Sequence, residues 1–160
     1  MERTDDGRYI VVNGRRWRAT DPSIPDALRQ ELVDELMSAR RAVRTDPATA
    51  RPRVQDAKVA LGERGEPWWD EATPDGRHQR LAATARALLG HRGPDGALSS
   101  EDLARVVGGT GWAALTGEAR AVLGELAAAS VVRLDPDEHH VVHGPEWEQR
   151  SERWSEHPSG

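Results

Sequence analysis

Three histidines near the C-terminus are the residues best suited by type to metal or acid–base chemistry. His139, His140 and His143 lie close to Glu138 and Glu146 in the sequence, and imidazole and carboxylate groups are common ligands of zinc. On a β-strand, His139 and His143 would point to the same face but lie roughly 13 Å apart at ~3.3 Å per residue. That separation is too large for one ion without a bulge, so we expect no metal site on this hairpin.

A glycine-rich stretch raises the question of phosphate binding. Residues 108–111 read Gly-Gly-Thr-Gly and precede a predicted helix. A phosphate-binding loop needs a strand before its glycines and a Lys-Ser or Lys-Thr pair after them, and this sequence has neither. We interpret the stretch as a turn between helices. No serine–histidine or carboxylate pair has a spacing typical of catalysis, so we predict a non-enzymatic protein with no catalytic residue and no cofactor.

The densest positive charge is predicted where one helix ends and the next begins. Arg40, Arg41 and Arg44 precede this break, and Arg51 and Arg53 follow it. Such a cluster can attract phosphates or an acidic partner. Cations at a helix C-terminus also stabilise the helix by ~0.3–1 kcal/mol each, so a solvated helix end is the simpler interpretation.

Two adjacent tryptophans follow the second of these helices. The indoles of Trp68 and Trp69 can cover the apolar seam of a small core or form a stacking platform for a base or a peptide. We favour the core interpretation, because aromatic residues beside an apolar seam are usually buried. The candidate contacts for a partner or a nucleic acid are Arg15, Arg16, Arg18, Arg40, Arg41, Arg44, Arg51, Arg53, Lys58, Trp68 and Trp69.

Composition excludes several classes of protein. The 160 residues carry a net charge of −5, spread nearly evenly over the two halves, so neither half is a general phosphate binder. The chain has no cysteine, which excludes a disulfide framework and a cysteine-ligated metal. No apolar run approaches the ~20 residues of a membrane helix, and no signal peptide is visible. We expect a cytoplasmic protein with no membrane partner.

Residues 1–66 are predicted to form one module that begins with a β-hairpin. Asn13-Gly14 is the favoured pair for a tight type I′ turn, because both residues tolerate a positive φ. We expect Tyr9, Val11 and Trp17 to share one face of this hairpin.

Two helices are predicted to complete this module. Leucines and valines at helical spacing predict the first helix over residues 25–44. The second helix is expected to hold Pro52 in its first turn and to stop at Gly62 or Gly65.

The remaining chain is predicted to hold a linker, a second domain and a tail. Residues 67–76 are rich in Pro, Asp and Gly and are predicted to be the linker. Residues 77–147 are predicted to hold three helices and then two strands, with a serine cap at Ser99 and the third helix starting at Trp112. Residues 148–160 are predicted to be a flexible tail.

This order of elements is typical of a winged helix-turn-helix. The segments RALLGHRGPDGALSSEDLARVVG and GWAALTGEAR resemble an uncharacterised winged-helix family of short bacterial proteins. The segments RWRATDPSIPDALRQELVDELMSARRAVR and RVQDAKVALGERGEPWW resemble an actinobacterial family of unknown function, often labelled Tol-type biopolymer transporters. These resemblances imply a winged helix in the second half and assign no catalytic residue. The predicted fold class is α+β and mainly helical.

The third predicted helix of residues 77–147 would be the recognition helix of a winged helix-turn-helix. Its charges argue against recognition of DNA bases. Its exposed positions are Glu118, Arg120 and Glu125 among alanines, whereas base edges are read mostly by Arg, Lys, Asn or Gln. The tip of the last hairpin, residues 135–138, is acidic and would repel phosphates. We therefore predict a non-enzymatic interaction module, a cytoplasmic adaptor or regulatory protein with a protein partner. The alternative is a DNA- or RNA-binding regulator that uses the arginine cluster.

Overall fold

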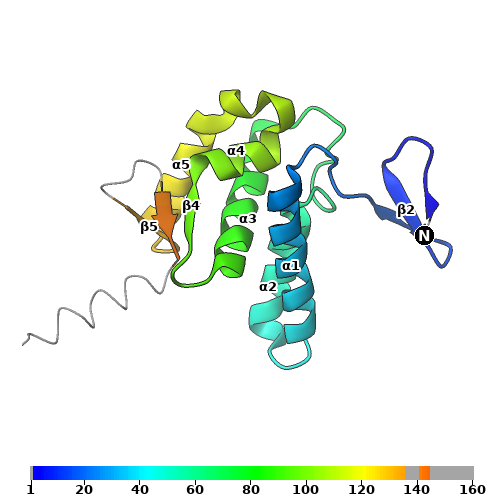
Figure 1. Cartoon of the computed structure of the whole chain (residues 1–160), viewed down its shortest axis with the longest axis horizontal. Helices are drawn as coiled ribbons and strands as arrows, with labels where there is room; N and C mark the ends of the chain where they lie inside the picture. The colour runs from blue at the N-terminus through cyan, green and yellow to red at the C-terminus, as the bar shows by residue number, and fades with distance from the viewer. Residues whose placement is uncertain (1, 136–140, 145–160) are drawn as a thin grey trace, which may run out of the picture.

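The computed structural model describes residues 2–135 and 141–144 and is a mixed α+β fold that is mainly helical. Figure 1 shows a small N-terminal sheet on one side, a helical pair in the middle, and further helices with a second small sheet on the other side. The coarse fold class predicted from the sequence is confirmed. The predicted tail, residues 148–160, lies outside the described residues, and so do His139 and His140.

The N-terminal sheet is antiparallel, with the order β1-β2-β3. Its strands are β1 (Glu2–Arg3), β2 (Tyr9–Val12) and β3 (Arg15–Arg18). Asn13 and Gly14 form the turn between β2 and β3, and both have the positive φ that this turn requires, 51° and 75°. The strand β1 was not predicted, because two residues carry no readable alternation.

The helices α1 (Asp26–Ala42) and α2 (Pro47–Ala60) form the central pair. Leu28, Leu32, Leu36 and Ala39 line the buried face of α1, at the helical spacing that the sequence shows. The predicted start of α2 near Pro52 is wrong. The helix begins five residues earlier, because Asp46 caps it and Pro47 fits a first turn that needs no N–H donor.

The second half begins with a longer helix than expected. The helix α3 (Pro74–Arg92) starts inside the predicted linker, because Thr73 caps it by accepting a hydrogen bond from the Gly76 amide and Pro74 occupies its first turn. The elements that follow are β4 (Ala97–Ser99), α4 (Ser100–Gly108), the 3₁₀ helix η1 (Gly109–Leu115), α5 (Thr116–Ala128), β5 (Arg133–Leu134) and β6 (Val141–His143). Their sheet has the order β4-β6-β5.

Both ends of the α4 segment follow local sequence signals. Ser99 and Asp102 form the reciprocal hydrogen bonds of a capping box at its start, as predicted. The expected start of the next helix at Trp112 is wrong, because residues 109–115 form η1 and α5 begins only at Thr116. The backbone departs from helical angles at Gly111, which accounts for the late start.

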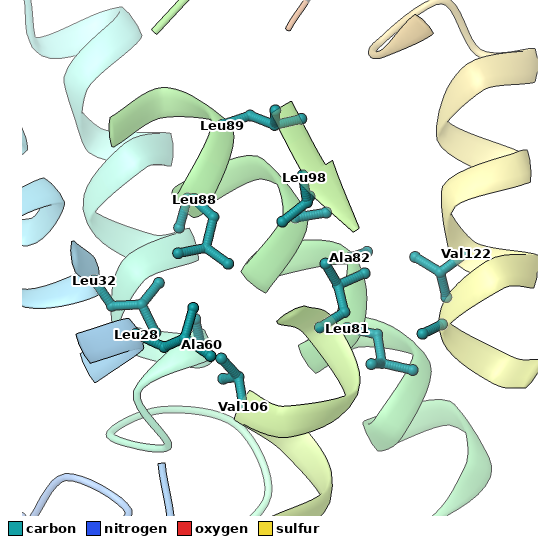
Figure 2. Close-up of a cluster of buried hydrophobic side chains, with 14 of the residues drawn as sticks. Leu28, Leu32, Ala60, Leu81, Ala82, Leu88, Leu89, Leu98, Val106 and Val122 are labelled. Carbon is teal, nitrogen blue, oxygen red and sulfur yellow. The ribbon is translucent and has the colours of Figure 1, made fainter. Parts of the chain in front are cut away.

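One buried apolar cluster runs through both halves of the chain. Figure 2 shows Leu28 and Leu32 of α1 and Ala60 of α2 lying near Leu88 of α3, while Leu81 of α3 lies farther along the cluster, toward Val122. The cluster continues through side chains of β4, α4 and α5, namely Leu98, Val106 and Val122. The apolar seams of the two predicted modules are therefore joined across the expected boundary.

The partly buried Arg92 also bridges the two halves. Arg92 at the end of α3 forms ion pairs with Glu31 of α1, at 2.9 Å, and Asp102 of α4, at 2.8 Å. Hydrogen bonds from Arg92 to both carboxylates, with Glu31 the stronger influence, raise the pKa of the guanidinium. Because each carboxylate lies on a different element, Arg92 fixes α1 and α4 against α3.

Glu66 gives a prediction for the entry to α3. Its carboxylate accepts hydrogen bonds from the Thr73 hydroxyl, at 2.7 Å, and the Thr73 amide, at 2.9 Å, and the hydroxyl is the larger cause that lowers the pKa of Glu66 below its ordinary 4.5. These bonds stabilise the fold above the ordinary pKa and are lost as the pH falls through the lowered one. In an NMR titration, Thr73→Ala should raise the midpoint of Glu66 toward 4.5, and the control Thr110→Ala should leave it unchanged. An unchanged midpoint in Thr73→Ala would contradict this origin of the shift.

Candidate functional site

A groove of about 510 Å³ lies between the β2–β3 hairpin and the helices α1 and α2. We call it the hairpin groove. Its lining is mostly aliphatic and aromatic, with cations at its edges: Ile10, Val12, Trp17, Arg18, Val33, Leu36, Met37, Arg40, Lys58, Leu61 and Glu63.

Large apolar side chains are exposed around this groove. Val12 is 38% exposed, Trp17 43% and Met37 39%, and the only other large apolar side chain so exposed within residues 2–135 and 141–144 is Leu134. A single exposed apolar side chain is common on folded proteins, but several gathered on one surface are typical of a binding site. The hairpin groove is therefore the strongest candidate site among the described residues.

Strand register explains why Trp17 faces the groove. Trp17 is paired with Ile10 across the hairpin, so the two side chains share a face with Val12. Tyr9 and Val11 point to the opposite face, and the prediction that they share a face with Trp17 is wrong. The two-residue turn sets this register, so the face of each side chain follows from the pairs across the turn and not from alternation along one strand alone.

Cations lie against the indole of Trp17. The Arg15 guanidinium is 4.9 Å and the Lys58 ammonium 5.6 Å from the ring centroid, within the range of a cation–π interaction. Burial is the largest cause that lowers the pKa of Lys58, followed by the positive charges of Arg64 and Arg40, which Glu63 opposes. Two cations, Arg15 and Lys58, thus lie beside the exposed ring of Trp17.

The positive surface continues from the groove along α1 and α2. Arg40 lines two further hollows, one with Arg51 and Arg64 and one with Arg41 and Arg44. Among the residues that the structure describes, no carboxylate lies within 4.0 Å of any cation of this surface. We call the set the cationic surface; its members are Arg15, Arg18, Arg40, Arg41, Arg44, Arg51, Lys58 and Arg64.

Arginines elsewhere behave differently. Ion pairs with carboxylates engage Arg29, Arg53, Arg77, Arg80, Arg86, Arg92 and Arg105. Seven arginines elsewhere are thus neutralised by carboxylates, whereas no cation of the cationic surface has such a partner among the described residues. Arg3, Arg8 and Arg120 lie outside this surface and likewise form no ion pair with a described carboxylate.

The structure brings most of the predicted contact residues together. Arg18, Arg40 and Lys58 line the hairpin groove, and Arg41, Arg44 and Arg51 extend from it. Arg16 lies over the Tyr9 ring, at 4.1 Å from its centroid, on the other face of the sheet.

Arg53 is already engaged inside the protein. Its guanidinium donates to both carboxylate oxygens of Glu35, at 2.7 and 3.1 Å, and Glu35 is only 2% exposed. The Glu35 hydrogen bond is the largest cause that raises the pKa of Arg53. Arg53 therefore holds α2 against α1 and has little free capacity for a partner.

The adjacent tryptophans connect the N-terminal sheet to the segment after α2. Trp68 donates from Nε1 to the Ala19 carbonyl at 2.9 Å and packs edge-on against Trp69, with centroids 5.2 Å apart. Trp69 in turn packs against Tyr9 at 5.5 Å. Both indoles are half-buried, so they fix the sheet in place and offer less free surface than Trp17. Trp17 was not among the predicted contact residues, although Arg15, Arg16 and Arg18 beside it in the sequence were a usable signal.

The acidic residues of α5 lie against α3. Glu118 forms an ion pair with Arg77, and Glu125 with His78. Arg120 is exposed on the same helix. Within the described residues, no group of three His, Asp or Glu side chains is arranged to hold a metal ion.

Comparison with protein-family models, with curated proteins and with solved structures found no match to this chain. The resemblances to the winged-helix and actinobacterial families stay predictions. None of the helices within the described ranges is long and apolar enough to cross a membrane.

Proposed function

We propose that this protein is a non-enzymatic interaction module whose partner is an acidic protein segment with apolar side chains, bound along the hairpin groove. The exposure of Val12, Trp17 and Met37 at the rim of one cation-edged groove carries this proposal. Apolar anchors provide most of the affinity of such interfaces, and complementary charge guides and selects the partner.

The lining of the groove favours a protein segment over a nucleic acid. Ile10, Val33, Leu36 and Leu61 provide an aliphatic floor, which accepts apolar side chains. Bases bind single-stranded nucleic-acid sites chiefly by stacking on aromatic rings, and the hairpin groove offers only Trp17 for that purpose.

We further propose that α3 to β6 is a winged helix used for protein contact. The helix and strand order, with a sheet of order β4-β6-β5, supports this interpretation. On α5, Glu118 and Glu125 lie among alanines and form ion pairs with side chains of α3. The helix α5 is therefore poor in side chains that recognise DNA bases.

Charge reversal at the groove tests the proposed function. A synthetic peptide in which Leu and Trp alternate with Glu is expected to bind the wild-type protein, and Arg40→Glu is expected to weaken binding about tenfold, which is ~1.4 kcal/mol. The matched control Arg120→Glu changes the net charge equally but lies on α5, so it should have little effect. Calorimetry measures the affinity of the wild-type protein and of each variant for this peptide and for a version in which Lys replaces Glu. An equal loss of peptide affinity in Arg40→Glu and Arg120→Glu would refute the proposal. Equal affinity of the wild-type protein for the two peptides would also refute it.

Nucleic acid is the second candidate partner, because the arginines of the cationic surface form no ion pair with a described carboxylate. If it is the partner, a single-stranded or duplex oligonucleotide should bind below micromolar at physiological salt. Replacing Arg41 and Arg44 by alanine should then flatten the salt slope by about two units, at ~0.9 per lost phosphate contact. Oligonucleotide binding of this kind, with no peptide binding, would replace our proposal with this alternative.

A further inference from the structure

A hollow of about 530 Å³ lies beside the hairpin groove, where the end of α1 meets α2 and the segment after α2. We call it the arginine hollow. Arg40 comes from the last turn of α1, Arg51 from α2, and Arg64 from the segment that follows α2. Arginines from three parts of the chain therefore line one hollow, and its other lining residues are Val43, Val54 and Gln55.

The arginines of this hollow keep their charge and most of their hydrogen-bond donors. Their side chains are exposed, and no carboxylate of the described residues lies within 4.0 Å of their nitrogens. Arg64 donates from Nη1 to Gln55 Oε1 at 2.6 Å. Because the amide is neutral, this bond orients the guanidinium without cancelling its charge, and a guanidinium has further N–H groups to donate.

The positive charge of this hollow also acts on Lys58. Burial is the largest cause that lowers the pKa of Lys58, and the charges of Arg64 and Arg40 come next, against the opposing charge of Glu63. Positive charge at Arg40 and Arg64 thus disfavours another cation nearby. The same charge favours a bound anion.

A phosphoryl group matches such a hollow better than a carboxylate does. It carries a charge of about −1.5 to −2 at neutral pH and three strong acceptor oxygens, and planar guanidinium groups bind it through paired hydrogen bonds. We propose that the arginine hollow binds a phosphoryl group on a side chain of the acidic segment that occupies the hairpin groove. This inference rests on the proposed function and makes the partner a phosphorylated protein.

Arg40 connects the two parts of this site, because its side chain lines both the arginine hollow and the hairpin groove. One bound segment can therefore place apolar side chains in the groove and a phosphoryl group in the hollow. Val43 and Val54 offer apolar contact to the carbon atoms that carry the phosphoryl group. The described lining of the hollow includes no aromatic ring on which a base could stack, which favours a phosphorylated protein over a nucleic acid.

Phosphopeptides test the arginine hollow. The peptide in which Leu and Trp alternate with Glu is extended by one phosphoserine at either end, and calorimetry compares each form with its unphosphorylated serine version. Phosphorylation at one of the two ends should raise the affinity about tenfold. The affinity for the unphosphorylated peptide reports on the hairpin groove, whereas the gain on phosphorylation reports on the arginine hollow. The two proposals can therefore fail separately.

A pair of double variants locates the phosphoryl group. Arg51→Gln combined with Arg64→Gln should reduce the gain on phosphorylation from about tenfold to less than about twofold. The matched control, Arg3→Gln combined with Arg120→Gln, changes the net charge equally and should keep the gain. All four side chains are exposed, so the Tm of both double variants should stay close to that of the wild-type protein. No gain at either end of the peptide, or an equal gain in the two double variants, would overturn the inference.

Two further measurements cover the remaining outcomes. If the peptide binds in neither form, N-acetyl-phosphoserine amide is titrated into the wild-type protein and followed by NMR. Shifts of the Val54 and Gln55 amides that disappear in the Arg51→Gln, Arg64→Gln variant would support the hollow, and no such shifts would overturn it. An oligonucleotide whose affinity falls in that variant, while the phosphopeptide affinity does not, would assign the hollow to nucleic-acid phosphates and overturn the inference.

Discussion

The Asp21→Ala variant is expected to lose about 3–5 kcal/mol of its free energy of unfolding. The Asp21 carboxylate is 4% exposed and accepts a hydrogen bond from Arg80 at 2.9 Å. It also accepts hydrogen bonds from the Ser23 amide and hydroxyl, at 2.9 and 2.7 Å. Its removal leaves the Arg80 guanidinium buried without a counter-ion, and desolvation already lowers the pKa of that guanidinium.

Urea denaturation measures this loss, with Asp26→Ala as the matched control. Asp26 also pairs with an arginine, but its side chain is 95% exposed, so its removal should change stability by less than about 0.5 kcal/mol. Combining Asp21→Ala with Arg80→Met removes the stranded charge and should recover part of the loss. Equal stability of the Asp21→Ala and Asp26→Ala variants would show that the buried pair is not needed.

The Leu88→Ala variant is expected to lose about 2–5 kcal/mol, the second large effect. Leu88 is fully buried on α3, and Figure 2 shows it within the cluster that α1, α2 and α4 also build. Truncation removes apolar contacts and leaves a cavity that packed helices cannot fully close.

The control for this variant is Leu134→Ala. Leu134 is 45% exposed on β5, so the same truncation there should cost well under 1 kcal/mol. Thermal and urea denaturation measure the stability of the Leu88→Ala and Leu134→Ala variants. A loss in Leu88→Ala no greater than that in Leu134→Ala would contradict the single joined core.

Local signals predicted much of the fold. Periodic leucines identified α1, the Asn13-Gly14 pair identified the hairpin, and the Ser99 capping box identified the start of α4. Each of these features depends on residues within a few positions of one another, so a single sequence contains the information.

Features that depend on distant residues were harder to predict. Arg92 and Glu31 are 61 positions apart, and nothing in the local pattern of either shows that they meet. The joined core and the hairpin groove likewise arise only when α1 and α2 pack against other elements. Charge clustering therefore identified much of the cationic surface, but neither the groove nor the role of Trp17.

Residue Arg92 holds together segments from three parts of the chain. It bonds to Glu31, to Asp102 and, at 2.8 Å, to the Ala97 carbonyl. If α1 separated from α3, the Arg92 guanidinium would lose its ion pair with Glu31. The apolar side chains packed between α1 and α3 would also become exposed to water. We therefore expect the helical pair and the elements after it to unfold as one cooperative unit, with no stable intermediate in which only one half is folded.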